Sequence, residues 1–170
     1  MNKKLILILA CLLPISLIAQ DLKFGIFNRT EIFQSMPEYL AAAKKVDDLA
    51  KTYESELMTI QEEYQKKGSE FVAAKDTLPE AIKTRRMTEI QGLEQRLQEF
   101  YQDSQKEIQK TQQDLLNPVS AKLLNAVKAV GNENGFVYIF DTSVNAVLMY
   151  WSPEKCIDVT NLIRAKLNMK

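Results

Sequence analysis

The chain of 170 residues contains no histidine. This absence excludes Ser-His-Asp and Cys-His catalysis and every zinc site that needs an imidazole ligand. Its five glycines form no phosphate-binding pattern, which excludes a Walker A loop and a dinucleotide fingerprint. Neighbouring carboxylates such as Asp47 and Asp48 point in different directions on a helix and are typical of solvated surface. The sequence therefore predicts no catalytic residue, no metal site, no cofactor and no enzyme.

Cysteine and excess charge are also scarce. The chain has two cysteines, Cys11 and Cys156, and equal numbers (22 each) of basic and acidic residues. Nucleic-acid binders usually carry a large positive excess, so no nucleic-acid partner is expected.

The N-terminus has the three parts of a secretory signal. A short basic stretch with Lys3 and Lys4 precedes an apolar run over residues 5–18, and Ala19 provides a small residue for cleavage. The run is shorter than the ~20 residues that span a bilayer. We therefore expect residues 1–19 to be a cleavable signal peptide, with Cys11 inside it and Cys156 as the one cysteine of the mature chain.

A long helical hairpin is the dominant prediction, and we assign it to residues 37–118 with its tip near 75–80. Apolar or small residues recur at alternating steps of four and three, which keeps one stripe of a helix against a partner. Only Lys67 interrupts the first stripe, and the second is looser, with an extra residue near Ser104. We expect Pro118 to kink or interrupt the second helix. The stripes are Tyr39, Ala43, Val46, Ala50, Tyr53, Leu57, Ile60, Tyr64 and Phe71, then Ile82, Ile90, Leu93, Leu97, Phe100, Ile108 and Leu115.

Local signals place the ends of the helices. An acceptor side chain followed three residues later by glutamate is a capping box, which is found at Asn28, Ser35 and Thr77. We expect the first long helix to begin at the Ser35 box and to end near Ala74, and the return helix to begin after Thr77.

The two ends of the chain predict a small β-rich body, assigned to residues 20–36 and 119–170. Strands are expected over 22–27, 136–140 and 146–151, the last two as a hairpin joined by 141–145. Asp158 is expected to cap a last helix with the apolar face Val159, Leu162, Ile163 and Leu167. The fold class is α+β, mainly α. Such a small core favours oligomerisation.

Two sets of exposed residues are candidate sites. Met58, Met87 and Tyr101 lie off the main stripes or on a mixed surface, where flexible or amphipathic side chains suit weak contacts with many partners. The tip is locally basic, since six cations outnumber Glu70, Asp76 and Glu80. Ordinary solvated surface is the alternative for both sets. The cations are Lys66, Lys67, Lys75, Lys83, Arg85 and Arg86.

The order of these parts resembles the OmpH/Skp family of periplasmic chaperones. The matching segments are Phe24 to Asn28, Ile32-Phe33 with Pro37-Glu38, the charged hairpin, Leu123 to Val130, Gly135 to Asp141, and the tail with Tyr150 to Pro153 and Ile157 to Thr160. The resemblance implies a jellyfish-shaped, prefoldin-like homotrimer whose arms enclose a cavity. It also implies a periplasmic holdase that needs no ATP and keeps unfolded outer-membrane β-barrel proteins soluble.

In that frame Met58, Met87 and Tyr101 are expected to face the cavity. The body would be formed by Phe24, Ile26, Phe136, Ile139, Val147 and Leu148. The six tip cations would contact clients, anionic lipid or lipopolysaccharide. This chain departs from well-known members, which are strongly basic, because it is neutral. An alternative function is an envelope scaffold whose coiled coil binds one defined partner.

Overall fold

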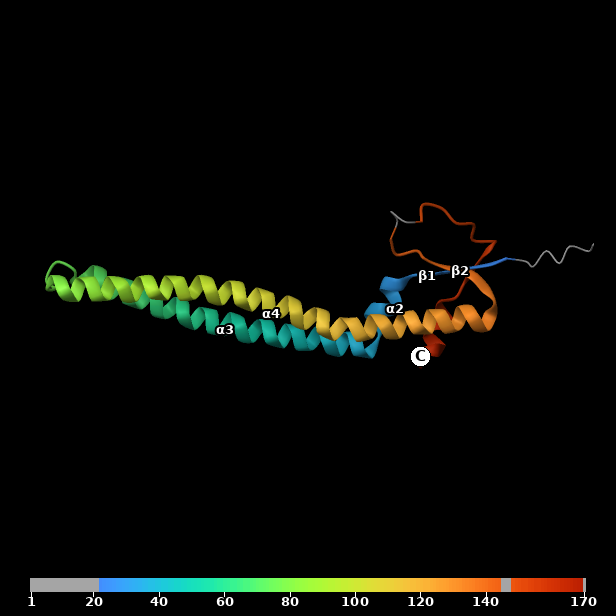
Figure 1. The fold of residues 1–170 in the computed structure, drawn as a ribbon, viewed down its shortest axis with the longest axis horizontal. Coiled ribbons are helices and arrows are strands. Elements are labelled where there is room, and N and C mark those ends of the chain that lie inside the picture. The colour runs from blue at the N-terminus through green and yellow to red at the C-terminus, as the bar shows by residue number, and fades with distance from the viewer. Residues whose placement is uncertain (1–21, 145–147, 170) are drawn as a thin grey trace, which may run out of the picture. The chain divides into compact units, whose positions relative to one another are not determined.

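The computed structural model describes residues 22–144 and 148–169, so the expected signal peptide lies outside the described residues. The element order is β1 (Lys23–Phe27), α2 (Arg29–Ser35), α3 (Pro37–Ala74), α4 (Glu80–Asn134), β2 (Phe136–Asp141), β3 (Cys156–Asp158) and α5 (Thr160–Lys166) (Figure 1). Two compact units are present. One is Thr30–Leu124, and the other combines the described residues of 1–29 and 125–170. This mainly helical α+β architecture confirms the predicted fold class.

The unit Thr30–Leu124 is a helical hairpin in which α3 and the greater part of α4 lie side by side (Figure 1). The helices have 38 and 55 residues, and the turn between them follows Ala74, as predicted. Buried Ile60 and Leu93 lie on the shared seam, and the rings of Tyr53 and Phe100 meet edge to face at 5.9 Å. Because each helix supplies the other's apolar surface, the hairpin forms its own narrow core.

Some seam positions differ from the prediction. Ala42 is buried while Ala43 is exposed, and Ile82 is 36% exposed. Ser104 is buried on the seam, where its hydroxyl donates to the carbonyl of Phe100 at 2.6 Å. The extra residue expected near Ser104 is thus accommodated by a small side chain that satisfies its own polar group.

The predicted capping box at Ser35 is wrong. Ser35 is the last residue of α2, and its hydroxyl donates to the carbonyl of Ile32 at 2.8 Å. Met36 is the N-cap of α3 and is buried, while the Glu38 carboxylate accepts a hydrogen bond from Lys122 on α4. Burial of Met36 and the ion pair across the hairpin replace the expected local hydrogen bonds.

Pro118 is predicted to kink or interrupt the helix, and the interruption is wrong, because α4 continues through it to Asn134. Pro118 removes one backbone donor. The next turns, however, bury Val119 and Leu123, which are 5% and 2% exposed. Their burial in the hairpin outweighs the lost hydrogen bond. The helix ends at Gly135, whose φ of +70° suits a residue without a side chain.

The other unit contains a three-stranded sheet in the order β2-β1-β3, with both neighbours parallel to β1. Gly25 of β1 pairs with Ile139 of β2, whose side chain lies within 3.0 Å of where a Cβ on Gly25 would be. The Ile139 side chain also lies 3.6 Å from where a Cβ on Gly131 of α4 would be. Glycine therefore lets the sheet pack closely on this face.

The predicted hairpin over 136–151 is wrong. Residues 148–151 form no strand, residues 145–147 lie outside the described part, and the third strand is β3. The Ser152 carbonyl accepts a hydrogen bond from the Cys156 N–H at 3.0 Å, which closes a turn. β3 begins at this turn and pairs with β1. Pairing with β1, a contact between distant segments, overrode the β-forming composition of 146–151.

In α5, Val159 and Ile163 are fully buried and Leu167 nearly so, whereas Leu162 is 40% exposed and was wrongly placed on the apolar face. The Asp158 carboxylate accepts from the Thr160 N–H at 2.8 Å, but the N-cap position belongs to Val159.

Candidate functional site

The three predicted contact residues of the hairpin are exposed. Met58 and Tyr101 are each 55% exposed and Met87 is 48% exposed. Exposure separates them from the buried seam, as the sequence predicted. Sequence reasoning missed further exposed apolar residues, among them Leu40 and Val72, at 58% and 64%. Each of these two directly follows a stripe residue, Tyr39 or Phe71, and so lies beside the seam and not on it. That position next to the stripe is the signal by which the sequence could have identified them.

Hollows beside the seam accompany these side chains. A hollow of about 250 Å³ is lined by Tyr101, Ala50, Tyr53, Glu54, Leu57, Ser104, Gln105 and Ile108. It shares Ala50 with a second hollow of about 350 Å³ that extends to Tyr39 and Leu116. The small residues Ala43, Ala50 and Ser104 leave this space between the helices. The result is an apolar furrow open along one side of the seam.

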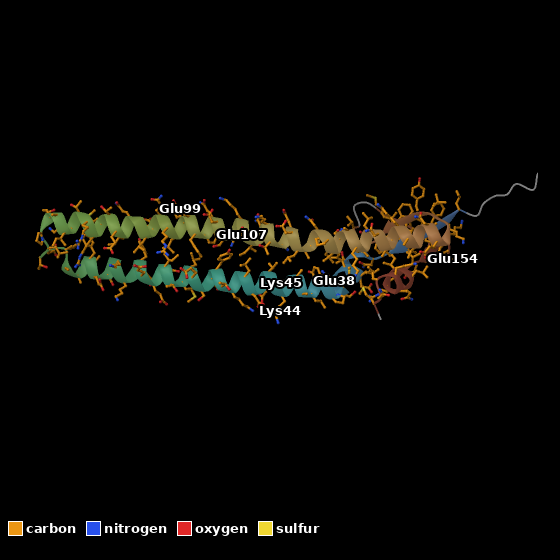
Figure 2. The ribbon with its side chains drawn as sticks, turned by 60° about the horizontal axis from the view of Figure 1, so that its bottom comes forward. Glu38, Lys44, Lys45, Glu99, Glu107 and Glu154 are labelled. Atoms are coloured by element: carbon orange, nitrogen blue, oxygen red, sulfur yellow. The ribbon has the colours of Figure 1, made fainter. Side chains whose placement is uncertain are left out.

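A third hollow, of about 340 Å³, lies around Pro118 and Ala42. Glu38 and Lys45 of α3 line it, and Figure 2 shows both side chains on this part of the helix. Lys122 donates to the Glu38 carboxylate, and this hydrogen bond is the main cause that lowers the pKa of Glu38. This pair and Lys45 are the charged residues in a lining that is otherwise apolar.

The tip cations are not a uniform positive patch. Lys67 occupies the gap in the apolar stripe and donates to Glu89 of α4 at 2.7 Å, while Lys83 donates to Glu80 at 2.8 Å. The Lys67 hydrogen bond lowers the pKa of Glu89 and raises that of Lys67, so both stay charged near neutral pH. A polar hollow of about 140 Å³ is lined by Lys67, Glu70, Arg85, Arg86, Glu89 and Ile90.

Glu89 therefore neutralises part of the positive charge at the tip. It lies just beyond the stretch from Lys66 to Arg86 that the sequence identified as locally basic. Lys67, Lys83 and Arg86 are half-buried, whereas Lys66, Lys75 and Arg85 are exposed. Only these last three present their charge outward as the prediction required.

The predicted body residues are half-buried where they are described. Phe24 and Ile26 share a sheet face with Tyr138 and Phe140, which the sequence did not single out. Phe24 stacks on Tyr138 and Tyr138 on Phe140, with ring centroids 6.4 and 5.8 Å apart. Tyr138 is 60% exposed. The sheet thus presents an aromatic face that its own unit leaves open.

The remaining body candidates are more scattered. Phe136 and Ile139 belong to β2, Leu148 lies outside any strand, and Val147 lies outside the described residues. Met149 and Tyr150 are 91% and 79% exposed. Nothing in the described part of their own unit covers these large side chains.

Within residues 22–144 and 148–169, no cluster of three or more acidic or cysteine side chains could hold a metal ion. None of the helices in this part of the chain combines the length and the apolar character needed to cross a membrane.

Comparisons with known proteins agree with the architecture. Residues 23–167 match the family described as outer membrane protein (OmpH-like). The chaperone protein Skp of Yersinia enterocolitica is 25% identical over 147 residues, which cover 86% of this chain and 88% of that protein. A solved structure of a candidate outer membrane chaperone (OmpH-like) from Caulobacter crescentus superposes with a TM-score of 0.72. It is 18% identical and covers 86% of this chain and 84% of its own, which shows a shared fold.

Proposed function

The chain belongs to the OmpH-like family, and on that premise we propose that it is a periplasmic holdase chaperone. It binds unfolded outer-membrane β-barrel proteins without ATP and prevents their aggregation in transit. Export by the signal peptide over residues 1–19 brings it to the periplasm. The similarity to a protein named chaperone Skp supports the chaperone role.

One observation carries this proposal: a long hairpin completes its own core yet leaves large apolar side chains in solvent. Met58, Met87 and Tyr101 remain about half exposed although the seam buries Ile60 and Leu93. Scattered contacts of this kind are weak individually and tolerate many sequences, which suits a client without fixed structure.

The body is proposed to assemble three copies. Its sheet has β2 and β3 at its edges and an exposed aromatic face with Tyr138 and Phe140. Proteins normally cover such edges and patches. A homotrimer formed there would bring three hairpins around one cavity, with Met58, Met87 and Tyr101 facing inward. Analytical ultracentrifugation should give three times the mass of the mature chain.

The exposed tip cations Lys66, Lys75 and Arg85 are proposed to contact anionic lipid or lipopolysaccharide, and to add only a minor contribution to client binding through acidic client segments. Their range is short because Glu80 and Glu89 neutralise neighbouring charges. Weakened binding to anionic vesicles on replacing all three by glutamine would support this role, and unchanged binding would refute it.

The central test dilutes a urea-unfolded outer-membrane β-barrel protein into buffer with and without the mature chain. No nucleotide is added, and light scattering is followed. Suppression near one trimer per client is expected. Undiminished scattering by a folded protein would overturn the holdase function and favour the envelope scaffold, which would recover one defined partner from an extract.

A further inference from the structure

Two stripes of residues, all exposed except half-buried Gly68, flank the seam on one side of the distal hairpin. Their spacing alternates between four and three residues, as the seam does, so each stripe stays on one face of its helix. On α3 the stripe is Met58, Gln61, Gln65, Gly68 and Val72. On α4 it is Thr84, Met87, Gln91, Glu94, Gln98, Tyr101 and Gln105. Together these twelve residues are called the neutral face, because Glu94 is their one charged member and Glu54, four residues before Met58, is the charged residue at its border.

The hollow between the helices shows that the two stripes share a side. Glu54, Tyr101 and Gln105 line the same depression. Met58 follows Glu54 by four residues and so continues that side of α3. Met87 precedes Tyr101 by fourteen residues, about four turns, and continues the same side of α4.

The flank on the other side of the seam has the opposite character. The Glu56 carboxylate lies 3.9 Å from the Arg96 guanidinium across the helices, which places both on that flank. Figure 2 shows Glu99 on the side of α4 that faces away from α3. Nine of the twelve equivalent positions here are charged, so this flank is called the charged face. Its residues are Glu56, Thr59, Glu63, Lys66, Glu70, Ile82, Arg85, Glu89, Gly92, Arg96, Glu99 and Asp103.

The neutral face suits a segment of membrane β-strand in its unfolded state. Such strands alternate apolar and polar residues and contain few charges on the lipid side. Met58, Met87, Val72 and Tyr101 are 48–64% exposed and can adapt to varied apolar side chains. Glutamine amides both donate and accept, and so can pair with the free backbone groups of an extended chain.

The cost of desolvating charged groups decides which of the two faces can bind an apolar segment. Covering the charged face with an apolar segment would strip water from ionised groups without replacing their partners, which is costly. On the neutral face only Glu94, and Glu54 at its border, would carry that cost. The charged face instead keeps the hairpin soluble and disfavours association through that side.

We propose that the neutral face is where this chain holds unfolded transmembrane β-strand segments, by apolar and amide contacts and without ionic attraction. The inference rests on the proposed chaperone function and specifies its contact surface. Because the face has almost no charge to screen, client binding should be nearly independent of salt.

The test compares two double variants that add the same charge on opposite sides. Gln61→Lys with Gln98→Lys places two ammonium groups on the neutral face. Thr59→Lys with Gly92→Lys places them on the charged face, also at exposed helical positions, and a Cβ added at Gly92 would have nothing within 4 Å. Circular dichroism first establishes equal helix content for both variants and the natural chain. Affinity for a urea-unfolded β-barrel protein is then measured at about 0.05 and about 0.5 M salt.

The neutral-face variant should lose about tenfold or more in affinity, one lysine desolvation being worth at least 1.4 kcal/mol. The matched variant should stay within about twofold, and the natural chain should change less than about threefold with salt. Equal losses in both variants, or strong weakening of the natural chain by salt, would overturn the inference while the chaperone function stands. If the natural chain does not bind the barrel protein, the proposed function fails, and the inference fails with it.

Discussion

Two neighbouring residues of α3 should separate stability from function. Ile60 is 2% exposed on the seam, whereas Met58 is 55% exposed beside it. Ile60→Ala removes three carbon groups, worth ~0.8 kcal/mol each, and leaves a cavity, so we expect a loss of about 3 kcal/mol. With a urea m-value of about 2 kcal/mol/M, the unfolding midpoint should fall by about 1.5 M. Circular dichroism at the helical band measures this shift.

Met58→Ala is the matched control. Its side chain is largely in water and alanine favours the helix, so stability should change by less than about 0.5 kcal/mol. Protection of a β-barrel client should nevertheless fall in this variant. Equal destabilisation by Ile60→Ala and Met58→Ala would refute the assignment of Ile60 to the core and Met58 to the surface.

Further predictions concern the sheet, the long helix and the ion pair. Gly25→Ala places a Cβ 3.0 Å from a side-chain carbon of β2 and should cost about 1–3 kcal/mol in thermal unfolding, while Gly68→Ala, with nothing within 4 Å, should be neutral or stabilising. Pro118→Ala restores a helix donor and should raise stability by up to about 3 kcal/mol, which a higher denaturant midpoint would show. The Glu38 carboxyl should titrate below its ordinary value of 4.5 by NMR and return toward it in Lys122→Met. Because the folded pKa is lowered, the pair stabilises the hairpin above the unfolded pKa and loses this contribution as pH falls through the folded one.

The hairpin could be predicted because its signal is local and repeated. Every turn from Tyr39 to Phe71 except the one at Lys67 contributes an apolar or small residue at about the same angular position, so an error at Ala43 does not change the result. The turn after Ala74 and the helix end at Gly135 also depend on residues within a few positions. The exposure of Met58, Met87 and Tyr101 followed from their places outside the seam or on mixed surface.

The body was harder, since its strands are selected by partners far apart in the chain. Residues 148–151 have β-forming side chains yet form no strand, and the short β3 pairs with β1 instead. Pro118 shows the same principle in a helix: burial of Val119 and Leu123 maintains a conformation that the local rule disfavours. Tertiary contacts therefore decided these elements.

The sequence by itself determined a chain with no formal net charge and no histidine, with a long helical hairpin and a small β-containing base. It could do so because composition and heptad spacing need no knowledge of distant contacts. Only the tertiary structure decided that Glu89 neutralises Lys67 at the tip and that β3 completes the sheet. It also brought the uncharged flanks of α3 and α4 to one side, because the register between two antiparallel helices is set by how their seam packs.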